Sequence, residues 1–425
     1  MKKTEYLKKL SGGEFDNILG KLYTTENIEK QKKRISDAVS RFSEIYPARD
    51  DIHIYSAPGR TEIGGNHTDH QHGCVIAAAV NLDVIGVTSF SNDNIVRIKS
   101  EGYSAFEISL DDLKIHNGEI GTSAIVRGIL YRFSKICKDK LQGFDMYVTS
   151  DVLSGSGISS SAAFENLISS AIDIYCNGGR AGAVEIAKIG QYAENVYFGK
   201  NSGLMDQMVS SVGGFVFIDF GNIDNPSIEK IDFDFNSTGH KLIITDTKGS
   251  HSDLTDDYVA IRSEMESVAE MFGKKVLREV DEADFRSNIV KIRENISDRA
   301  VLRAYHFFKE NKRAYDEAEC LKNSDFNGFL NLVRQSGESS ENYLQNLYSA
   351  KNPLKQEIPL AIMTGKEILG ESGAVRVHGG GFAGTIQAFV PDEKADEYIS
   401  AMNGIFGEDS CYILSVRPLG GTEII

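Results

Sequence analysis

Residues 64–73, GGNHTDHQHG, place three of the nine histidines and one aspartate within a few positions of each other. These side chains are His67, Asp69, His70 and His72. Imidazole and carboxylate groups bind metals, and short histidine-rich tracts often hold zinc. The same groups also offer the mixture of donors and acceptors that sugar hydroxyls require. The stretch by itself leaves metal binding and hydroxyl recognition open.

A second stretch, SGSGISSSA at residues 154–162, follows an expected strand and opens an expected helix. Glycine lets the backbone approach a ligand closely, and the free N–H groups at a helix start favour an anion. The stretch therefore predicts a phosphate-binding loop. It lacks the lysine of a Walker A loop, and Ser160 stands where a dinucleotide fingerprint has its third glycine. A serine-capped turn is the alternative.

Glycines recur in VRVHGGGFAGT at residues 375–385. An HGGG run can form a lipase-like oxyanion loop, but the chain has no Gly-x-Ser-x-Gly nucleophile elbow. A tight connection between strands is the favoured interpretation of this run alone.

The composition excludes several classes of protein. The chain has 425 residues, 41% of them hydrophobic, which suits a globular protein of two or three domains. A net charge of −15 argues against general binding to nucleic acid or anionic membranes. No apolar run is long enough to span a membrane, and the N-terminus lacks a secretory h-region. The five scattered cysteines fit a reducing cytoplasm.

The elements expected to position these motifs mix helices and strands without regular alternation, which predicts an α+β fold. Hydrophobic periodicity predicts helices at 25–45, 159–176 and 183–199, and a helix-rich stretch over 257–347. Alternating or buried apolar runs predict strands at 53–57, 84–90, 95–100, 144–150, 213–220, 241–247, 383–391 and 411–417.

Three motifs follow one another along the chain: APGRTEIGGNHTDHQHG, then SGSGISSSAAFE with NSGLMDQ, then VRVHGGGFAGT. Together they resemble the GHMP sugar and metabolite kinases, and most closely the galactokinases. The resemblance implies two α+β domains, here 1–218 and 219–425, with the active site in the cleft between them. Residues 1–25 lie outside it as an N-terminal extension.

The resemblance implies ATP as phosphoryl donor. The loop that would hold its phosphates consists of Gly155, Ser156, Gly157, Ile158, Ser159, Ser160 and Ser161. The catalytic carboxylate implied is Asp206, with Arg60 beside it. A sugar hydroxyl is a poor nucleophile, so a carboxylate that takes its proton helps phosphoryl transfer. A guanidinium nearby would keep that carboxylate ionised and offset charge on the phosphoryl oxygens.

The resemblance also implies Mg²⁺, held by Ser161 and Glu194. The residues it assigns to the sugar are Asn66, His67, Asp69, Gly203 and Tyr258.

The signature departs from the family pattern Gly-Arg-x-Asn-x-x-Gly-Glu-His-x-Asp-Tyr. Asn66 replaces the glutamate, Glu62 replaces the asparagine, and Gly64 replaces an apolar residue. His70 stands where the family has tyrosine, and Leu153 where a proline often precedes the phosphate loop. The change at Asn66 keeps the identity of the sugar open.

The expected activity is ATP-dependent phosphorylation of the anomeric hydroxyl of D-galactose. The alternatives are a kinase of N-acetylgalactosamine, galacturonate or arabinose, and a non-catalytic galactose sensor. The expected partners are a small sugar and ATP, with no nucleic acid or membrane, in a monomer or weak oligomer. The expected location is the cytoplasm.

Overall fold

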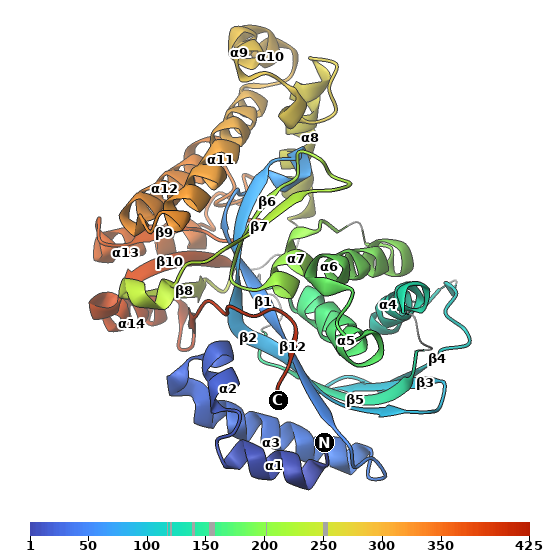
Figure 1. Cartoon of the computed structure of the whole chain (residues 1–425). Helices are drawn as coiled ribbons and strands as arrows, with labels where there is room; N and C mark the ends of the chain where they lie inside the picture. Colours follow the sequence, from blue (N-terminus) through green and yellow to red (C-terminus); the bar gives the residue numbers. More distant parts are fainter. Residues whose placement is uncertain (117, 120, 138–140, 153–157, 201, 250–253) are drawn as a thin grey trace.

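The strands of the computed structural model form two sheets with helices packed on them (Figure 1). The model describes the chain apart from residues 117, 120, 138–140, 153–157, 201 and 250–253. The strands of the larger sheet are β1 (His53–Gly64), β2 (Cys74–Ser91), β3 (Ile95–Ser100), β4 (Phe106–Ser109), β5 (Gly143–Ser150), β6 (Phe215–Asp219), β7 (Ser227–Ile231) and β12 (Thr422–Glu423). Those of the smaller sheet are β8 (His240–Asp246), β9 (Ala374–Val377), β10 (Thr385–Pro391) and β11 (Cys411–Leu414).

The helices fall into groups along the chain. The N-terminal group is α1 (Lys3–Ser11), α2 (Asp16–Tyr23) and α3 (Ile28–Ile45). The next group is α4 (Thr122–Ile136), α5 (Ser160–Asn177), α6 (Gly182–Tyr192) and α7 (Met205–Val212), with a π-helical segment at Ala193–Phe198. The remaining helices are α8 (Thr255–Glu270), α9 (Glu282–Ser287), α10 (Ile289–Asn295), α11 (Asp298–Lys322), α12 (Phe326–Ser339), α13 (Glu357–Leu369) and α14 (Ala395–Phe406).

The larger sheet runs in the order β12-β1-β2-β5-β3-β4, with β6 paired to β2 and β7 paired to β6. The smaller sheet runs β11-β8-β10-β9. Most neighbouring strands are antiparallel, while β3 and β5 are parallel. This mixture of helices and largely antiparallel sheets confirms the predicted α+β class. The predicted boundary between residues 218 and 219 falls inside β6, and the division into two domains stays a prediction.

The strand β1 is longer than the five residues that periodicity predicts, because it continues through Pro58 and Gly59 to Gly64. Proline lacks the N–H that a strand ladder needs, so it argues against a strand in the sequence. The register of β1 against β2 shifts between Pro58 and Arg60, and again between Glu62 and Gly64. Such bulges accommodate an irregular residue and re-aim the side chains beside them. They set the direction of the residues that begin the signature.

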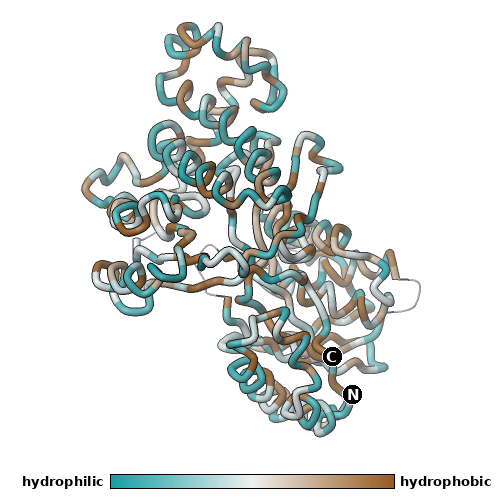
Figure 2. The backbone as a smooth tube through the Cα atoms, turned by 60° about the vertical axis from the view of Figure 1, so that its left-hand side comes forward, coloured by the Kyte–Doolittle hydropathy of each residue, from teal (hydrophilic) through white to brown (hydrophobic). Residues whose placement is uncertain are grey.

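The two faces of the larger sheet carry different helices. Side chains alternate along a strand, so Val84 packs into the cluster beneath α5, whereas Ile85 and Val87 pack against the N-terminal helices. The N-terminal extension is therefore part of a hydrophobic core, with Leu19 and Phe42 fully buried in it. Figure 2 shows apolar and polar segments alternating along these helices, as expected where one helix face is buried.

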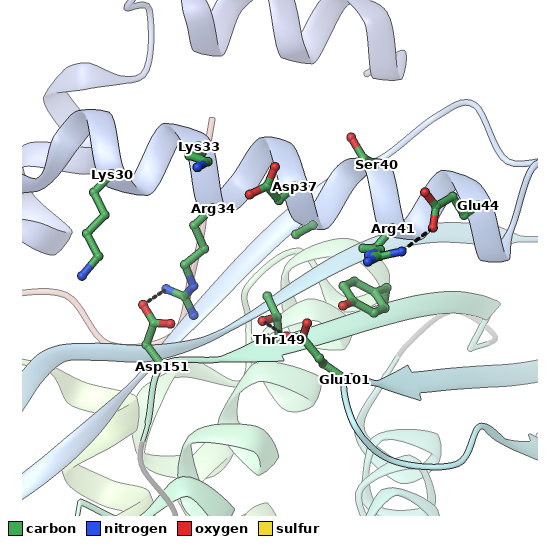
Figure 3. A pocket seen from close by; sticks show the side chains of 12 residues that line it. Lys30, Lys33, Arg34, Asp37, Ser40, Arg41, Glu44, Glu101, Thr149 and Asp151 are labelled. Carbon is green, nitrogen blue, oxygen red and sulfur yellow. Dashed lines mark hydrogen bonds and ion pairs between the residues drawn. The ribbon is translucent and has the colours of Figure 1, made fainter.

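A buried carboxylate fastens the N-terminal helices to the sheet. Asp83 accepts hydrogen bonds from Tyr23 Oη at 2.5 Å and from Arg34 Nη1 at 2.6 Å, and Arg417 pairs with it at 3.2 Å. Burial would raise the pKa of Asp83, but the two guanidinium groups hold it below its usual value. Arg34 also pairs with Asp151 at 3.1 Å, at the edge of a cavity of about 540 Å³ between α3 and β5 (Figure 3).

The C-terminal residues of the chain contact β1 and the first helix. In β12, Thr422 pairs with Ser56 and Glu423 with Tyr55 of β1. The carbonyl of Ile424 accepts a hydrogen bond from Tyr6 Oη at 2.9 Å. The larger sheet thus gains an edge strand from the C-terminal end of the sequence, and the residue after that strand is bound by an N-terminal helix.

Across the described residues, every helix is too short or too polar to cross a membrane.

Candidate active site

The centre of the site is the carboxylate of Asp206, which lies in the first turn of α7. Arg60 of β1 donates from Nε to Oδ1 at 2.7 Å, and Ser159 donates from Oγ to Oδ2 at 2.5 Å. Ser159 precedes α5 and has a left-handed backbone, with φ of 59°. Its hydroxyl makes no hydrogen bond that caps its own helix. The three predicted residues therefore converge from three different elements.

The surroundings of Asp206 keep its side chain charged. Burial acts to raise the pKa of this carboxyl, but Arg60, Ser159 and the more distant Lys200 together lower it below its ordinary value. The start of α7 adds a favourable dipole for a negative charge. Asp206 is therefore ionised at neutral pH and can accept a proton.

The described part of the predicted phosphate loop lies against the same strand. The backbone N–H of Arg60 donates to the carbonyl of Ile158 at 3.0 Å. A Cβ added at Gly59 would lie 2.6 Å from Ile158 Cγ2, so only glycine allows this approach. Ser160 and Ser161 begin α5. The predicted loop residues Gly155, Ser156 and Gly157 lie outside the described residues.

A cavity of about 770 Å³ opens beside the serines of this loop. Ser160, Ser161 and Phe164 of α5 line one side of it. Residues of α4, β5 and the segment before β4 also line it, among them Thr122, Val148 and Tyr103. Its volume is within the range of small-molecule sites, which is about 300–1,000 Å³.

Behind Asp206 lies a buried pair of carboxyl groups. Gln207 donates from Nε2 to both Glu165 and Glu194, at 3.0 Å in each case, and Lys200 pairs with Glu194 at 3.2 Å. Burial and the charge of Glu194 raise the pKa of Glu165 well above its usual value. Glu165 Oε1 is buried and lacks a hydrogen-bond partner among the described residues. Glu165 stands four residues after Ser161 on α5, so the two share a helix face.

The part of the signature that follows β1, residues 65–70, contacts two other segments of the site. A Cβ added at Gly203 would lie 3.6 Å from Asp69 Oδ2, which places these two predicted sugar residues side by side. His67 Nε2 donates to the carbonyl of Gly380 at 3.0 Å. Tyr258 Oη donates to the carbonyl of Gly381 at 2.9 Å. His67 and Tyr258 therefore meet at the glycine run of the third motif.

Asn66 is placed differently from these residues. It is 1% exposed, and its Nδ2 donates to Glu62 Oε1 at 2.9 Å and to the carbonyl of Gly379 at 2.7 Å. Its Oδ1 accepts from Asn346 Nδ2 at 2.9 Å. Both amide hydrogens of Asn66 are thus bound by the protein itself.

The histidines of the opening stretch, all of them described, do not converge on a metal centre. No group of three or more histidine, cysteine, aspartate or glutamate side chains suitable for a metal ion occurs in the part of the chain that the structure describes. Burial lowers the pKa of His70 to about 4, so its imidazole is neutral at pH 7. His72 has a left-handed backbone, with φ of 58°, as expected for a turn residue.

Two residues of α11 that hold the backbone of Gly65 and Asn66 in place were not predicted from the sequence. His306 of α11 donates from Nε2 to the carbonyl of Asn66 at 2.9 Å, and Glu310 accepts from the backbone N–H of Gly65 at 3.2 Å. Both side chains are fully buried on a helix whose other faces are charged. A histidine and a glutamate four residues apart on one helix face were the available signal, but nothing in the sequence connects that face to residues some 240 positions earlier.

Comparisons with known proteins agree with this geometry. Residues 40–90 match the galactokinase galactose-binding signature, and residues 124–214 match the GHMP kinases N terminal domain. A galactokinase of Glaesserella parasuis is 32% identical over 80% of this chain and 85% of its own. One of Actinobacillus pleuropneumoniae is 32% identical over 84% of this chain and 90% of its own. The chain belongs to the galactokinase family.

Solved structures show that this galactokinase family member has the GHMP kinase fold. The galactokinase of Lactococcus lactis, solved in complex with galactose, superposes with a TM-score of 0.76 at 21% identity, covering 91% of this chain and 99% of its own. The mevalonate kinase of Methanococcus jannaschii superposes with a TM-score of 0.60 at 16% identity, covering 86% of this chain and 98% of its own. The predicted family and fold are confirmed.

Proposed function

We propose that this protein transfers the terminal phosphoryl group of ATP to the anomeric hydroxyl of D-galactose, giving galactose 1-phosphate and ADP. The observation that carries the proposal is the carboxylate of Asp206, held between Arg60 of the signature strand and Ser159 of the phosphate loop. The galactose-binding signature and the relatives named galactokinase support galactose as the substrate.

Asp206 is the proposed base. Its lowered pKa keeps it ionised, so it orients the anomeric hydroxyl and takes its proton as the new O–P bond forms and the bond to ADP breaks. Arg60 keeps the carboxylate charged and offsets negative charge that builds on the phosphoryl oxygens. Positioning and electrostatics supply most of the catalysis in such a transfer.

The phosphates of ATP are proposed to lie on the loop from Gly155 to Ser161, where α5 begins and its free N–H groups favour an anion. The adjoining cavity of about 770 Å³ is proposed to hold the nucleoside. Phe164 and Tyr103 line that cavity and offer apolar surface to a base.

Mg²⁺ is proposed to bind at Ser161 and Glu194. A hydroxyl and a carboxylate are the hard oxygen donors that Mg²⁺ prefers. The unpartnered Oε1 of Glu165, beside Glu194 and one turn from Ser161, fits a place that a hydrated cation would occupy. When bound by these residues, the ion would supply positive charge that offsets the negative charge of the ATP phosphates. Lys200 pairs with Glu194 at 3.2 Å and adds positive charge beside the same carboxylate.

The sugar is proposed to bind between Asp69 and Gly203 on one side and His67 and Tyr258 on the other. This grouping combines carboxylate, imidazole, phenol and backbone N–H groups, which suits a ligand rich in hydroxyls. The site would then lie in the cleft between two domains. The cytoplasm is the proposed location, since none of the five cysteines forms a disulfide in the described structure, as is usual in a reducing compartment.

The test is ADP release in the presence of Mg²⁺ and ATP with galactose, N-acetylgalactosamine, glucose, galacturonate or arabinose. We expect a strong preference for galactose. Turnover on one of the other sugars alone would establish a related sugar kinase instead. Sugar binding without turnover on any of them would establish a sensor.

The proposed base is tested with Asp206→Asn, which we expect to lower kcat by about 10²–10⁴-fold. Asp219→Asn is the matched control, because Asp219 also pairs with an arginine, Arg278, at 2.9 Å. The control should keep nearly full turnover. Near-normal turnover in Asp206→Asn would remove Asp206 from the mechanism.

A further inference from the structure

Three side chains donate hydrogen bonds to three successive carbonyls of one loop. The loop consists of Gly379, Gly380 and Gly381 and is called the glycine loop below. Asn66 donates to its first carbonyl at 2.7 Å, His67 to its second at 3.0 Å, and Tyr258 to its third at 2.9 Å. The glycine loop is therefore fastened to residues that the resemblance assigns to the sugar.

Asn66 differs from the other two donors in its burial and in how many of its hydrogen-bonding groups the protein already binds. His67 and Tyr258 are only half-buried, whereas Asn66 is 1% exposed. A primary amide has two donor hydrogens. In Asn66 one of them binds Glu62 and the other binds Gly379, while its oxygen accepts from Asn346. A sugar hydroxyl that took either hydrogen would have to break a buried hydrogen bond.

Glu62 is itself held in place by the strand that leads into the glycine loop. Arg376 of β9 donates from Nη2 to Glu62 Oε1 at 3.0 Å, and from Nη1 to the carbonyl of Ile63. Arg376 and Glu62 have side-chain exposures of 1% and 11%. The same oxygen of Glu62 thus receives Asn66 and Arg376. This contact ties β1, the signature and β9 together.

Two of the departures from the family pattern, at positions 62 and 66, are consequently neighbours in space. Where the pattern has asparagine, this chain has Glu62, and where it has glutamate, this chain has Asn66. The two side chains bind each other at 2.9 Å. In this chain the exchange places one amide and one carboxylate in contact, with the amide at position 66 as the donor. Considered singly, each change looks like an altered sugar contact, but together they form one structural pair.

We propose that Asn66 is a positioning residue: with Glu62 as its partner it fastens the glycine loop and does not contact the sugar. This rests on the proposed sugar kinase function. Its consequence for that function is specific, because the replacement of glutamate by asparagine then leaves the choice of sugar unchanged. His67, held against the same loop, is the residue whose placement depends on Asn66.

The first measurement is hydrogen exchange of the peptide that spans residues 378–384, made without sugar or ATP. In Asn66→Ala we expect its backbone amides to exchange about tenfold faster, since buried hydrogen bonds are lost. Asn311→Ala is the matched control. Asn311 accepts from the backbone N–H of Cys74 at 2.7 Å, at the far end of the signature, and makes no hydrogen bond to the glycine loop in the described structure. Unchanged exchange in Asn66→Ala would overturn the proposal. This readout does not depend on any activity, so it is separate from a failure of the proposed function.

The second measurement is the ratio of kcat/KM for galactose to that for 6-deoxygalactose and 2-deoxygalactose. We expect Asn66→Ala to lower kcat/KM by about tenfold on every sugar, with each ratio within about twofold of its original value. A selective change in one ratio of more than about tenfold would show that Asn66 contacts that hydroxyl. That result would also overturn the proposal.

Asn66→Asp provides a second variant in case the alanine variant does not fold. Aspartate keeps the acceptor for Asn346 but loses both donors and faces the carboxylate of Glu62. A positioning role predicts faster exchange of the glycine loop in Asn66→Asp. It also predicts partial recovery when Asn66→Asp is combined with Glu62→Gln, because the amide introduced by the second change can donate to the new carboxylate. No recovery, with exchange unaffected by either change, would contradict the pairing.

Discussion

Ser159 and Asp206 are 47 positions apart in the sequence, and the hydroxyl of one donates to the carboxylate of the other at 2.5 Å. The start of α5, where an anion would bind, is thereby joined to the start of α7, where the proposed base lies. A serine before a helix ordinarily caps that helix. Here Ser159 has a left-handed backbone and its hydroxyl points to the carboxylate of Asp206.

Ser159→Ala is expected to lower kcat by about 10- to 100-fold, because a hydrogen bond to a charged group is worth about 1.5–3 kcal/mol. Ser169→Ala is the control, since Ser169 is buried on the same helix and its hydroxyl has no hydrogen-bond partner among the described residues. Steady-state kinetics with galactose and ATP check both variants. Equal effects in the two would show that the contact with Asp206 has no catalytic role.

Arg60→Met is expected to change the pH profile of kcat/KM. Burial raises the pKa of Asp206 and Arg60 opposes this, so removing Arg60 moves the pKa upward. The ordinary pKa of an aspartate is about 4. Because the pKa of Asp206 lies below that, the unsubstituted protein loses activity through this group only below about pH 4. The variant should show an acid limb at higher pH than the unsubstituted protein does.

The control for this profile is Arg278→Met, which breaks the distant pair with Asp219. It should leave the profile unchanged. A flat profile in Arg60→Met down to about pH 4 would mean that Arg60 does not set the charge of Asp206.

Glu194→Gln is expected to raise the Mg²⁺ concentration that gives half-maximal activity by about tenfold or more, because a carboxylate ligand is replaced by a neutral amide. Glu185→Gln is the control. Glu185 lies on α6, just before the segment that carries Glu194, and pairs with Arg132 at 2.8 Å. An unchanged Mg²⁺ requirement in Glu194→Gln would argue that this carboxylate is not a ligand.

Tyr23→Phe is expected to lower the free energy of unfolding by about 1–3 kcal/mol. The hydroxyl donates to the buried carboxylate of Asp83, which would lose one of its donors while remaining charged. Urea titration at neutral pH measures the change. Tyr46→Phe serves for comparison, because that ring packs on Phe42 of the same helix group, and it should change stability by less than about 0.5 kcal/mol.

Local patterns predicted much of the fold and of the reaction centre. The expected strand at 95–100 matches β3, and the expected helix at 159–176 begins and ends within one residue of α5. Asp206, Arg60 and Ser159 could be proposed together because each belongs to a short motif that resembles a motif of the GHMP kinases. Such motifs need no knowledge of distant contacts.

Contacts between remote segments could not be predicted in this way. Asn66 binds Gly379 and Asn346, which are 313 and 280 positions away, so its sequence neighbours carry no sign that its amide is occupied. The strand β1 was expected to end before Pro58, and only its pairing with β2 through bulges shows why it continues. The packing of the N-terminal helices on the sheet depends on the same kind of long-range contact.

The closure of the larger sheet by β12 has a consequence for synthesis of the protein. The strand β1 emerges early from the ribosome, but its partner in β12 follows more than 350 positions later. At about 5–20 residues per second, the nascent chain spends on the order of tens of seconds with that edge of β1 unpaired. An open strand edge invites pairing with other chains. Residues 422–424 therefore cover this edge of β1 only at the end of synthesis. A chain truncated before them should keep the edge unpaired and be prone to aggregate.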